Sequence, residues 1–217
     1  MCNAYCILFG AIHLKSSEVK GKRVIEVGSY DTNGSLRPLL ESYGPVEYIG
    51  VDIVEGRGVD VVCKAEDILD RFGKERFDLV ISTELLEHIQ DWKKIVHNFK
   101  NICKVGGIIL ITTRSYGAPY HGHPYDFWRY EIEDMKHIFS DCLLEKLEKD
   151  PLKGVFIKVK KPSKFAERNL SDYKLYSILL NRRIKEIAKK DFERNSRRLI
   201  MKQKIRNFLR SVKGLLS

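Results

Sequence analysis

The chain has 217 residues, of which 43% are hydrophobic, and a formal net charge of +10. No apolar run approaches the roughly 20 residues of a membrane-spanning helix. The longest candidate, residues 4–14, lacks the basic start and small-residue cleavage site of a secretory signal. We therefore expect a cytoplasmic protein with one core-forming domain and an extension.

The positive charge is unevenly placed. Residues 160–217 contain 18 Lys or Arg against 5 Asp or Glu, and the rest of the chain contains 21 against 24. Any attraction to an anionic partner is therefore expected in the C-terminal part. The five cysteines, Cys2, Cys6, Cys63, Cys103 and Cys142, have no zinc-ligand spacing, so we expect reduced thiols, no structural metal and no metal-ligating residues in the site.

Strands and helices alternate through the first half of the chain. The patterns predict strands at 23–27, 47–52, 59–63, 77–82 and 108–112, and helices at 35–43, 65–72 and 92–103. Asp91 precedes the third of these helices and is expected to cap it. Alternation of this kind is typical of a parallel sheet covered by helices on both faces.

The pattern then changes. A polar and aromatic loop at 114–130, expected to lack secondary structure, precedes a helix at 131–139 and strands at 143–148 and 154–159. The connection between these strands is too short for a parallel crossover, so they should pair antiparallel. The sequence thus predicts an α/β domain over residues 1–161. Its seven-stranded, doubly wound, Rossmann-like sheet is mostly parallel and ends in an antiparallel hairpin.

Residues 162–217 are expected to form a basic helical extension, with no strands after Ser171 and an amphipathic helix from Arg197 to Leu216. Three interpretations remain open: an interfacial helix on an anionic membrane, a contact with RNA phosphates, and packing against the domain or a second subunit. We expect residues 163–217 to be separable from the active site.

The turn after the first strand, in VIEVGSYDTNGS, suggests the ligand. Open α/β sheets bind ligands at the carboxyl ends of their strands. Tyr30 occupies the position of the second glycine of a dinucleotide fingerprint, which argues against NAD and FAD. Glu26 would repel a pyrophosphate and attract a cation. Asp52, at the end of the next strand, can accept hydrogen bonds from both hydroxyls of a ribose.

Five ordered motifs support this interpretation: VIEVGS, YIGVDI, AEDIL, FDLVISTELLEHI and GGIILITT. Together they resemble the class I S-adenosylmethionine-dependent methyltransferases of the methyltransferase type 11 kind, over roughly residues 22–161. The resemblance implies methyl transfer with S-adenosylmethionine as cofactor. It places Glu26, Gly28, Asn33 and Gly34 around the methionine part, Asp52 at the ribose, and Ala65 and Glu66 at the adenine.

The expected cofactor site also includes Ser29, Ile53, Thr83 and Glu84. Glu87, three residues after Glu84, is expected to be a solvated charge on a helical turn.

The loop RSYGAPYHGHPYDFWRY is expected to face the acceptor, with His121, His123 and Asp126 as catalytic candidates. An imidazole has an ordinary pKa near ~6.5 and can accept a proton, and His88 is a further candidate. Trp128 is interpreted as a core residue.

The resemblance also bears on the acceptor. Methyltransferases that act on amino groups of bases or glutamine carry Asn-Pro-Pro-Tyr or Asp-Pro-Pro-Tyr after the fourth strand, and STEL stands at that place here. The difference favours an oxygen acceptor on a small molecule, sugar or lipid-linked glycan. The alternatives are RNA or protein methylation, and S-adenosylmethionine binding without catalysis.

Overall fold

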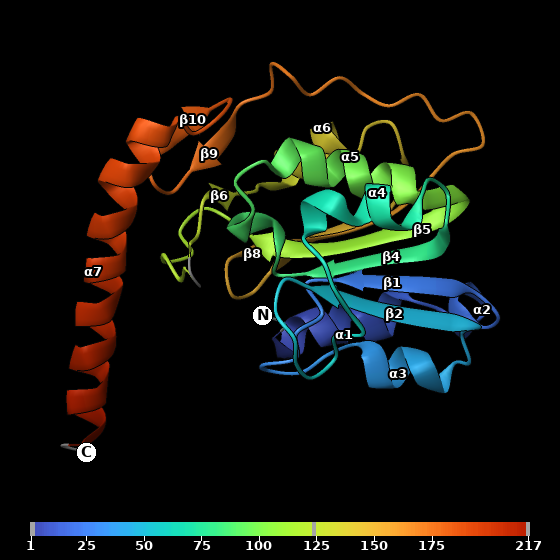
Figure 1. The fold of residues 1–217 in the computed structure, drawn as a ribbon, viewed down its shortest axis with the longest axis horizontal. Helices are drawn as coiled ribbons and strands as arrows, with labels where there is room; N and C mark the ends of the chain where they lie inside the picture. The colour runs from blue at the N-terminus through green and yellow to red at the C-terminus, as the bar shows by residue number, and fades with distance from the viewer. Residues whose placement is uncertain (1–2, 123–124, 216–217) are drawn as a thin grey trace.

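The computed structural model describes residues 3–122 and 125–215, and a seven-stranded sheet forms its centre (Figure 1). The strand order is β3-β2-β1-β4-β5-β8-β7. β1 to β5 are parallel, and β8 runs antiparallel to both β5 and β7. The expected mostly parallel sheet with a C-terminal antiparallel hairpin is confirmed. The strands are β1 (Arg23–Val27), β2 (Glu47–Asp52), β3 (Val61–Val62), β4 (Phe77–Thr83), β5 (Cys103–Arg114), β7 (Leu143–Asp150) and β8 (Gly154–Lys160).

Helices cover both faces of the sheet, as Figure 1 shows, so the doubly wound prediction is also confirmed. One face packs against α4 (Ile68–Phe72), α5 (Trp92–Ile102) and α6 (Ile132–Ile138), and the other packs against α1 (Ala4–His13) and α3 (Arg37–Ser42). The short helix α2 (Ser16–Val19) precedes β1. Two 3₁₀ turns, η1 (Ala65–Asp67) and η2 (Leu86–His88), follow the carboxyl ends of β3 and β4.

Helix α5 illustrates how the sequence determines an element. The carboxylate of Asp91 accepts a hydrogen bond from the backbone N–H of Lys94, at 3.1 Å, and so caps the helix as expected. Ile95, Val96 and Phe99 recur at helical spacing and are fully buried against the sheet. The helix ends at Ile102, where β5 begins directly and continues for 12 residues.

Helix α1 belongs to the folded domain. Its N-cap residue, Asn3, accepts hydrogen bonds from the N–H groups of Tyr5 and Cys6. Phe9 is buried, and Gly10 lies so close to Leu36 that a Cβ atom there would stand 2.4 Å from that side chain. The helix therefore closes the face of the sheet opposite α5.

A second sheet was not expected. β6 (Trp128–Arg129), β9 (Leu175–Ser177) and β10 (Arg182–Ile184) form an antiparallel three-stranded sheet. The prediction of an unstructured loop at 114–130 and the prediction of no strands after Ser171 are therefore both wrong in part. Strands of two or three residues carry too little periodicity to be recognised, and β6 and β9 are far apart in the sequence.

The first part of the extension, before residue 189, contributes buried side chains to the hydrophobic core. Leu170, Leu175, Leu179 and Ile187 are buried in the same cluster as Trp128. Helix α7 (Lys189–Leu215) then runs away from the sheet (Figure 1). The expected C-terminal helix is confirmed, although it starts earlier than Arg197, and its expected last residue, 216, lies outside the described part. The boundary after residue 161 stays a prediction.

Helix α7 touches the loop between β5 and β6. The ring of Phe192 lies 4.7 Å from that of Tyr125 and 5.8 Å from that of Phe127, measured between centroids. The guanidinium of Arg206 donates a hydrogen bond to the carbonyl of Tyr120, at 2.6 Å. Helix α7 is thus attached, near its start and again at Arg206, to the loop expected to meet the acceptor.

Cys63, Cys103 and Cys142 are free thiols, as expected, whereas the thiol of Cys6 donates a hydrogen bond to Glu84, and Cys2 lies outside the described residues. Within residues 3–122 and 125–215, no helix is both long enough and apolar enough to cross a membrane.

Candidate active site

A cavity of about 520 Å³ opens at the carboxyl ends of β1, β2 and β4. β1 pairs with β2 on one side and with β4 on the other, so the strand order reverses here, where open α/β sheets bind their ligands. The cavity wall includes five residues of the expected cofactor site: Gly28, Asp52, Ile53, Ala65 and Glu84.

Another depression, of about 280 Å³, lies at the opposite ends of the strands, near Ser17, Asp78 and Gly107. It is formed at the amino ends of the strands and contains none of the expected site residues. The larger cavity is therefore the candidate site.

The turn after β1 requires its glycine. Gly28 has φ of +81°, and its N–H donates to the carbonyl of Val51 at 2.8 Å. A Cβ atom at this position would also stand 3.1 Å from Cβ of Leu85. The buried Ser29 donates its N–H to the same carbonyl, at 3.1 Å. The turn is thereby joined to the end of β2, and Gly28 forms part of the cavity wall.

Asp52 fixes the neighbouring loops while lining the cavity. One carboxylate oxygen accepts a hydrogen bond from the N–H of Tyr30 at 3.1 Å, and the other accepts one from Val54 at 3.3 Å. Each carboxylate oxygen has a second lone pair, so the group retains acceptor capacity for ribose hydroxyls. Ile53 is 58% exposed beside it.

Glu26 lies beneath the turn rather than in the cavity wall. Its carboxylate accepts hydrogen bonds from the hydroxyl of Tyr48 at 2.7 Å and from that of Ser35 at 3.4 Å. Burial raises the pKa of Glu26 to about 7, although both hydrogen bonds act in the opposite direction. Asn33 and Gly34 are also outside the cavity wall, and the expected contacts of these three residues with the cofactor stay predictions.

The 3₁₀ turn η1 is held by the amide of Asn98, which donates to the carbonyls of Ala65 at 3.0 Å and Glu66 at 2.9 Å. Ala65 reaches the cavity, whereas Glu66 does not. Thr83, the last residue of β4, is buried and does not line the cavity. Adenine recognition by Glu66 remains a prediction.

Glu84 is a buried carboxylate in the cavity wall. It has φ of +56°, forms an ion pair with Arg114, and accepts a hydrogen bond from the thiol of Cys6 at 3.6 Å. Burial raises the pKa of Glu84, and the nearby charge of Glu87 raises it further. The left-handed backbone at this position directs the chain from β4 into η2.

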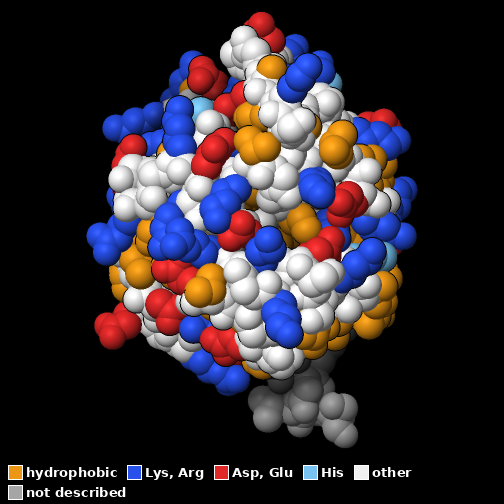
Figure 2. Space-filling view, turned by 90° about the vertical axis from the view of Figure 1, so that its right-hand side faces the viewer, with side chains coloured by type: hydrophobic (Ala, Val, Ile, Leu, Met, Phe, Trp, Pro, Cys, Tyr) orange, Lys and Arg blue, Asp and Glu red, His pale blue; other side chains and the backbone are white. Residues whose placement is uncertain are grey.

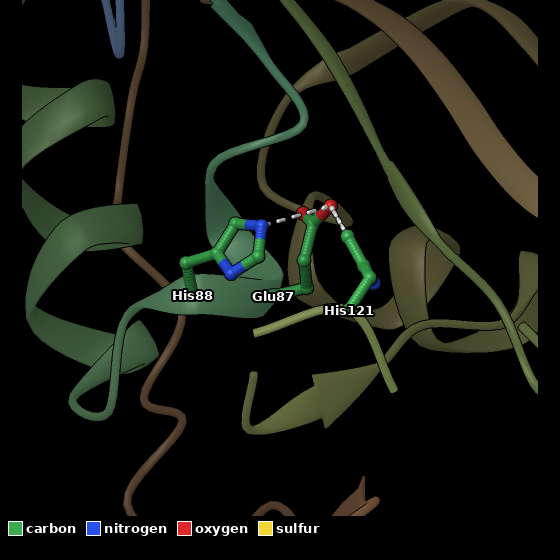
Figure 3. Close-up of side chains that lie close together, drawn as sticks. All are labelled: Glu87, His88 and His121. Atoms are coloured by element: carbon green, nitrogen blue, oxygen red, sulfur yellow. Dashed lines mark ion pairs between the residues drawn. The ribbon is translucent and has the colours of Figure 1, made fainter. Parts of the chain in front are cut away.

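Two histidines flank Glu87, as Figure 3 shows. Oε1 of Glu87 lies 3.6 Å from Nε2 of His121 and 3.9 Å from Nε2 of His88. One ligand-type atom from each residue lies within 4.8 Å of the others, so the group could hold a metal ion. His88 also lines the cavity, so this cluster adjoins the candidate cofactor site.

The expectation that Glu87 is solvated is wrong, because its side chain is fully buried. Burial alone would raise the pKa of Glu87, but the contacts with His121 and His88 lower it. The pair Glu87-His88 lies in the first turn after the buried strand β4, with three residues between the strand and the pair, and this position is the sequence signal that could have placed both side chains at the site. The three-residue spacing between Glu84 and Glu87 favoured a solvated helical turn instead, and this led to the wrong prediction.

The two histidines differ in charge. Burial lowers the pKa of His88. Burial would also lower the pKa of His121, but its contacts with the carboxylates of Asp126 and Glu87 raise it to about 9. With that pKa His121 is protonated at neutral pH, which favours an electrostatic role over the expected role as a base.

Asp126 serves to position its neighbours. Its buried carboxylate accepts two hydrogen bonds from Arg129, at 2.5 and 2.7 Å, and lies 3.0 Å from Nδ1 of His121. Arg129 also donates to the carbonyls of Ala118 and Pro119, which closes the loop on itself. His123 lies outside the described residues. Direct catalytic roles for His121, His123 and Asp126 stay predictions.

A family model described as a methyltransferase domain matches residues 8–146. The chain belongs to this methyltransferase family. The match covers the five parallel strands β1 to β5, the start of β7 and every described residue of the cavity wall. It confirms the expected enzyme class and, at the level of the family, the expected cofactor S-adenosylmethionine.

Curated relatives and solved structures agree with this assignment. The chain is 28% identical over 123 residues to a ubiquinone biosynthesis O-methyltransferase of Coxiella burnetii, covering 49% of this chain and 51% of the relative. This chain thus spans about half the length of the curated relatives it matches.

Similar folds occur in the 1,6-didemethyltoxoflavin-N1-methyltransferase of Burkholderia thailandensis, which holds S-adenosylhomocysteine, and in an S-adenosylmethionine-dependent methyltransferase of Mesorhizobium loti. The TM-scores are 0.60 and 0.56, at 13% and 15% identity. The matches cover 73% and 71% of this chain, and 79% and 96% of the respective structures. At this level of identity the likeness establishes the fold.

Proposed function

We propose that this methyltransferase binds S-adenosylmethionine in the cavity and transfers the methyl group to an oxygen atom of a small-molecule, sugar or lipid-linked acceptor. The observation that carries the proposal is the position of His88. It lines the cavity and also belongs to the cluster with Glu87 and His121. A group that can act on a hydroxyl proton therefore adjoins the candidate cofactor site.

The cavity fits the cofactor chemically. The bound cofactor would supply a methyl group on a positively charged sulfur, and the protein's task is to align the acceptor with it. Asp52 would hold the ribose, Ala65 and the apolar wall would receive the adenine, and the carboxylate of Glu84 would favour the cationic end. The Coxiella relative bears the name of an O-methyltransferase, which supports transfer to oxygen.

The basic extension is proposed to attach the enzyme to an anionic membrane surface. Met201, Ile205 and Leu209 recur every four residues on α7 and are each more than half exposed, among Lys and Arg residues. Figure 2 views the side opposite α7, where acidic and basic side chains are mixed rather than separated by sign. The excess of Lys and Arg lies in the extension, so an anionic partner is expected to bind there.

Two experiments test these proposals. Calorimetry with S-adenosylmethionine and S-adenosylhomocysteine should show binding that Asp52→Ala weakens; no binding of either at millimolar concentration would exclude the cofactor site.

Methyl-labelled cofactor should then label hydroxyl-bearing acceptors. Labelling of RNA or protein alone would exclude the oxygen acceptor, and binding without any transfer would support a non-catalytic module.

The extension is tested separately. The full chain should sediment with anionic vesicles and be released by high salt. A steep, salt-dependent retardation of RNA in place of vesicle binding would favour a nucleic-acid partner.

A further inference from the structure

We propose that Glu87, His88 and His121 bind one divalent metal ion of the zinc type. The ion would lie beside the cavity that His88 lines (Figure 3). Its role at the acceptor rests on the proposed function, whereas the binding of the ion does not.

The spacing of the three side chains suits metal ligands better than hydrogen-bonding partners. Oε1 of Glu87 lies 3.6 and 3.9 Å from the two Nε2 atoms, beyond the roughly 2.7–3.2 Å of a hydrogen bond. Two ligands at about 2.0–2.2 Å from one tetrahedral ion stand roughly 3.4 Å apart. The two distances from Glu87 are close to that value, and the two histidine nitrogens, which lie within 4.8 Å of each other, would move closer around an ion.

Both imidazoles are oriented by their other nitrogen. Nδ1 of His88 lies 2.6 Å from the carbonyl of Tyr125, and Nδ1 of His121 lies 3.0 Å from the carboxylate of Asp126. A carbonyl oxygen can only accept, so Nδ1 of His88 carries the proton, and its Nε2 is left as a lone pair in the neutral ring. Histidines that bind metal ions are held in this way, by a carbonyl or a carboxylate on the second nitrogen.

The carboxylate of Glu87 has one satisfied and one unsatisfied oxygen. Oε2 accepts a hydrogen bond from the hydroxyl of Thr113 at 2.8 Å. Oε1, which faces both histidines, is fully buried and has no hydrogen-bond partner among the described residues. A buried carboxylate oxygen is costly without a compensating positive charge. An ion between the three side chains would supply that charge.

An outer layer supports the site. Asp126, which orients His121, is buried and receives two hydrogen bonds from Arg129. Arg129 is itself 1% exposed and also donates a hydrogen bond to the carbonyl of Ala118, so hydrogen bonds on both sides of His121 tie its segment to Arg129. Two histidines and one carboxylate are a common set of ligands for catalytic zinc, and they leave a coordination position open.

The open position would receive the oxygen of the acceptor. A divalent ion lowers the pKa of a bound hydroxyl, whose proton then passes to solvent. The bond from that oxygen to the methyl carbon forms as the bond from carbon to sulfur breaks, so the step needs no oxidant or reductant. The competing explanation is a proton on His121, which supplies positive charge without a metal ion.

Zinc binding is tested on the full-length chain after chelator treatment. Titration with Zn²⁺ against a chromophoric chelator should show one tight equivalent, and Co²⁺ should give the absorption of a nitrogen- and oxygen-ligated ion. His121→Ala should weaken zinc binding at least about 100-fold, and Asp126→Asn should weaken it about 10- to 100-fold. The control is His97→Ala, because His97 is a surface histidine paired with Glu167, and it should bind like the wild type.

Three results would overturn the proposal: no stoichiometric zinc in the wild type, the same affinity in His121→Ala, or an equal loss in His97→Ala. His121 is 27% exposed, so its truncation should leave the fold intact, as S-adenosylhomocysteine calorimetry on the variant would verify. Nitrogen-15 NMR that shows His121 doubly protonated and unaffected by zinc would assign the charge to the proton. Absence of cofactor binding in the wild type would refute the proposed function and leave the zinc result valid.

Discussion

The buried carboxylate of Glu26 should make the stability of the enzyme depend on pH. The side chain is 2% exposed, and its pKa rises from 4.5 to about 7 in the folded protein, chiefly because burial penalises the charged form. The folded state therefore holds this proton more tightly than the unfolded state. The contribution of protonated Glu26 to the free energy of unfolding is complete below pH 4.5 and is lost as the pH rises through about 7. Above that pH it does not change further.

The free energy of unfolding should fall by about 3 kcal/mol over this pH range, because each tenfold change in proton affinity corresponds to roughly 1.4 kcal/mol. Glu26→Gln keeps the shape and an oxygen that can accept from Tyr48, but it cannot ionise. Urea denaturation of both proteins at pH 5 and pH 8 isolates the effect, since the other titrating groups cancel in the difference. From pH 5 to pH 8, the free energy of unfolding of the variant should rise by about 2–3 kcal/mol relative to that of the wild type. Parallel pH profiles would show that Glu26 is not buried as described.

Further predictions concern the cofactor, one tight contact and the extension. If Glu26 lies near the cationic end of S-adenosylmethionine, affinity should rise about tenfold between pH 6 and 8 in the wild type but stay constant in Glu26→Gln. Asp52→Ala should weaken the cofactor about 10- to 100-fold by calorimetry, whereas an unchanged affinity would contradict the ribose contact. Gly50→Ala would place Cβ 2.0 Å from the carbonyl of Gly58 and should cost about 1–3 kcal/mol in denaturant unfolding; a neutral effect would contradict that packing. Deletion of residues 189–217 should leave S-adenosylhomocysteine affinity within about twofold, and aggregation of the truncated chain would instead show that α7 covers the core.

The sequence predicted the sheet because its signals are local and repeated. β1, β2 and β4 are runs of five to seven residues with β-branched side chains, and the connection between β7 and β8 is too short for a crossover. The cavity position followed from the strand ends, so Gly28 and Asp52 were placed correctly in its wall. These inferences needed only spacing and strand direction.

The cluster at Glu87 could not be predicted in the same way. Its third member, His121, comes from a loop more than thirty residues later, and its position depends on the hydrogen bonds between Asp126 and Arg129. The small sheet has the same difficulty, since β6 and β9 find each other only in the folded chain. Patterns of charge and spacing show which side chains are present, but not which distant ones meet.

The pairing of Trp128 with Ser177 sets the order in which the enzyme can mature during its synthesis. The central sheet is complete once β8, ending at Lys160, has left the ribosome, and domains generally fold as units while translation continues. The loop that carries His121 and Asp126 gains its last partners only when β9 and β10 follow. A nascent chain from which only the residues up to 161–174 have emerged from the ribosome should therefore have a formed cofactor cavity and an acceptor side that is still immature.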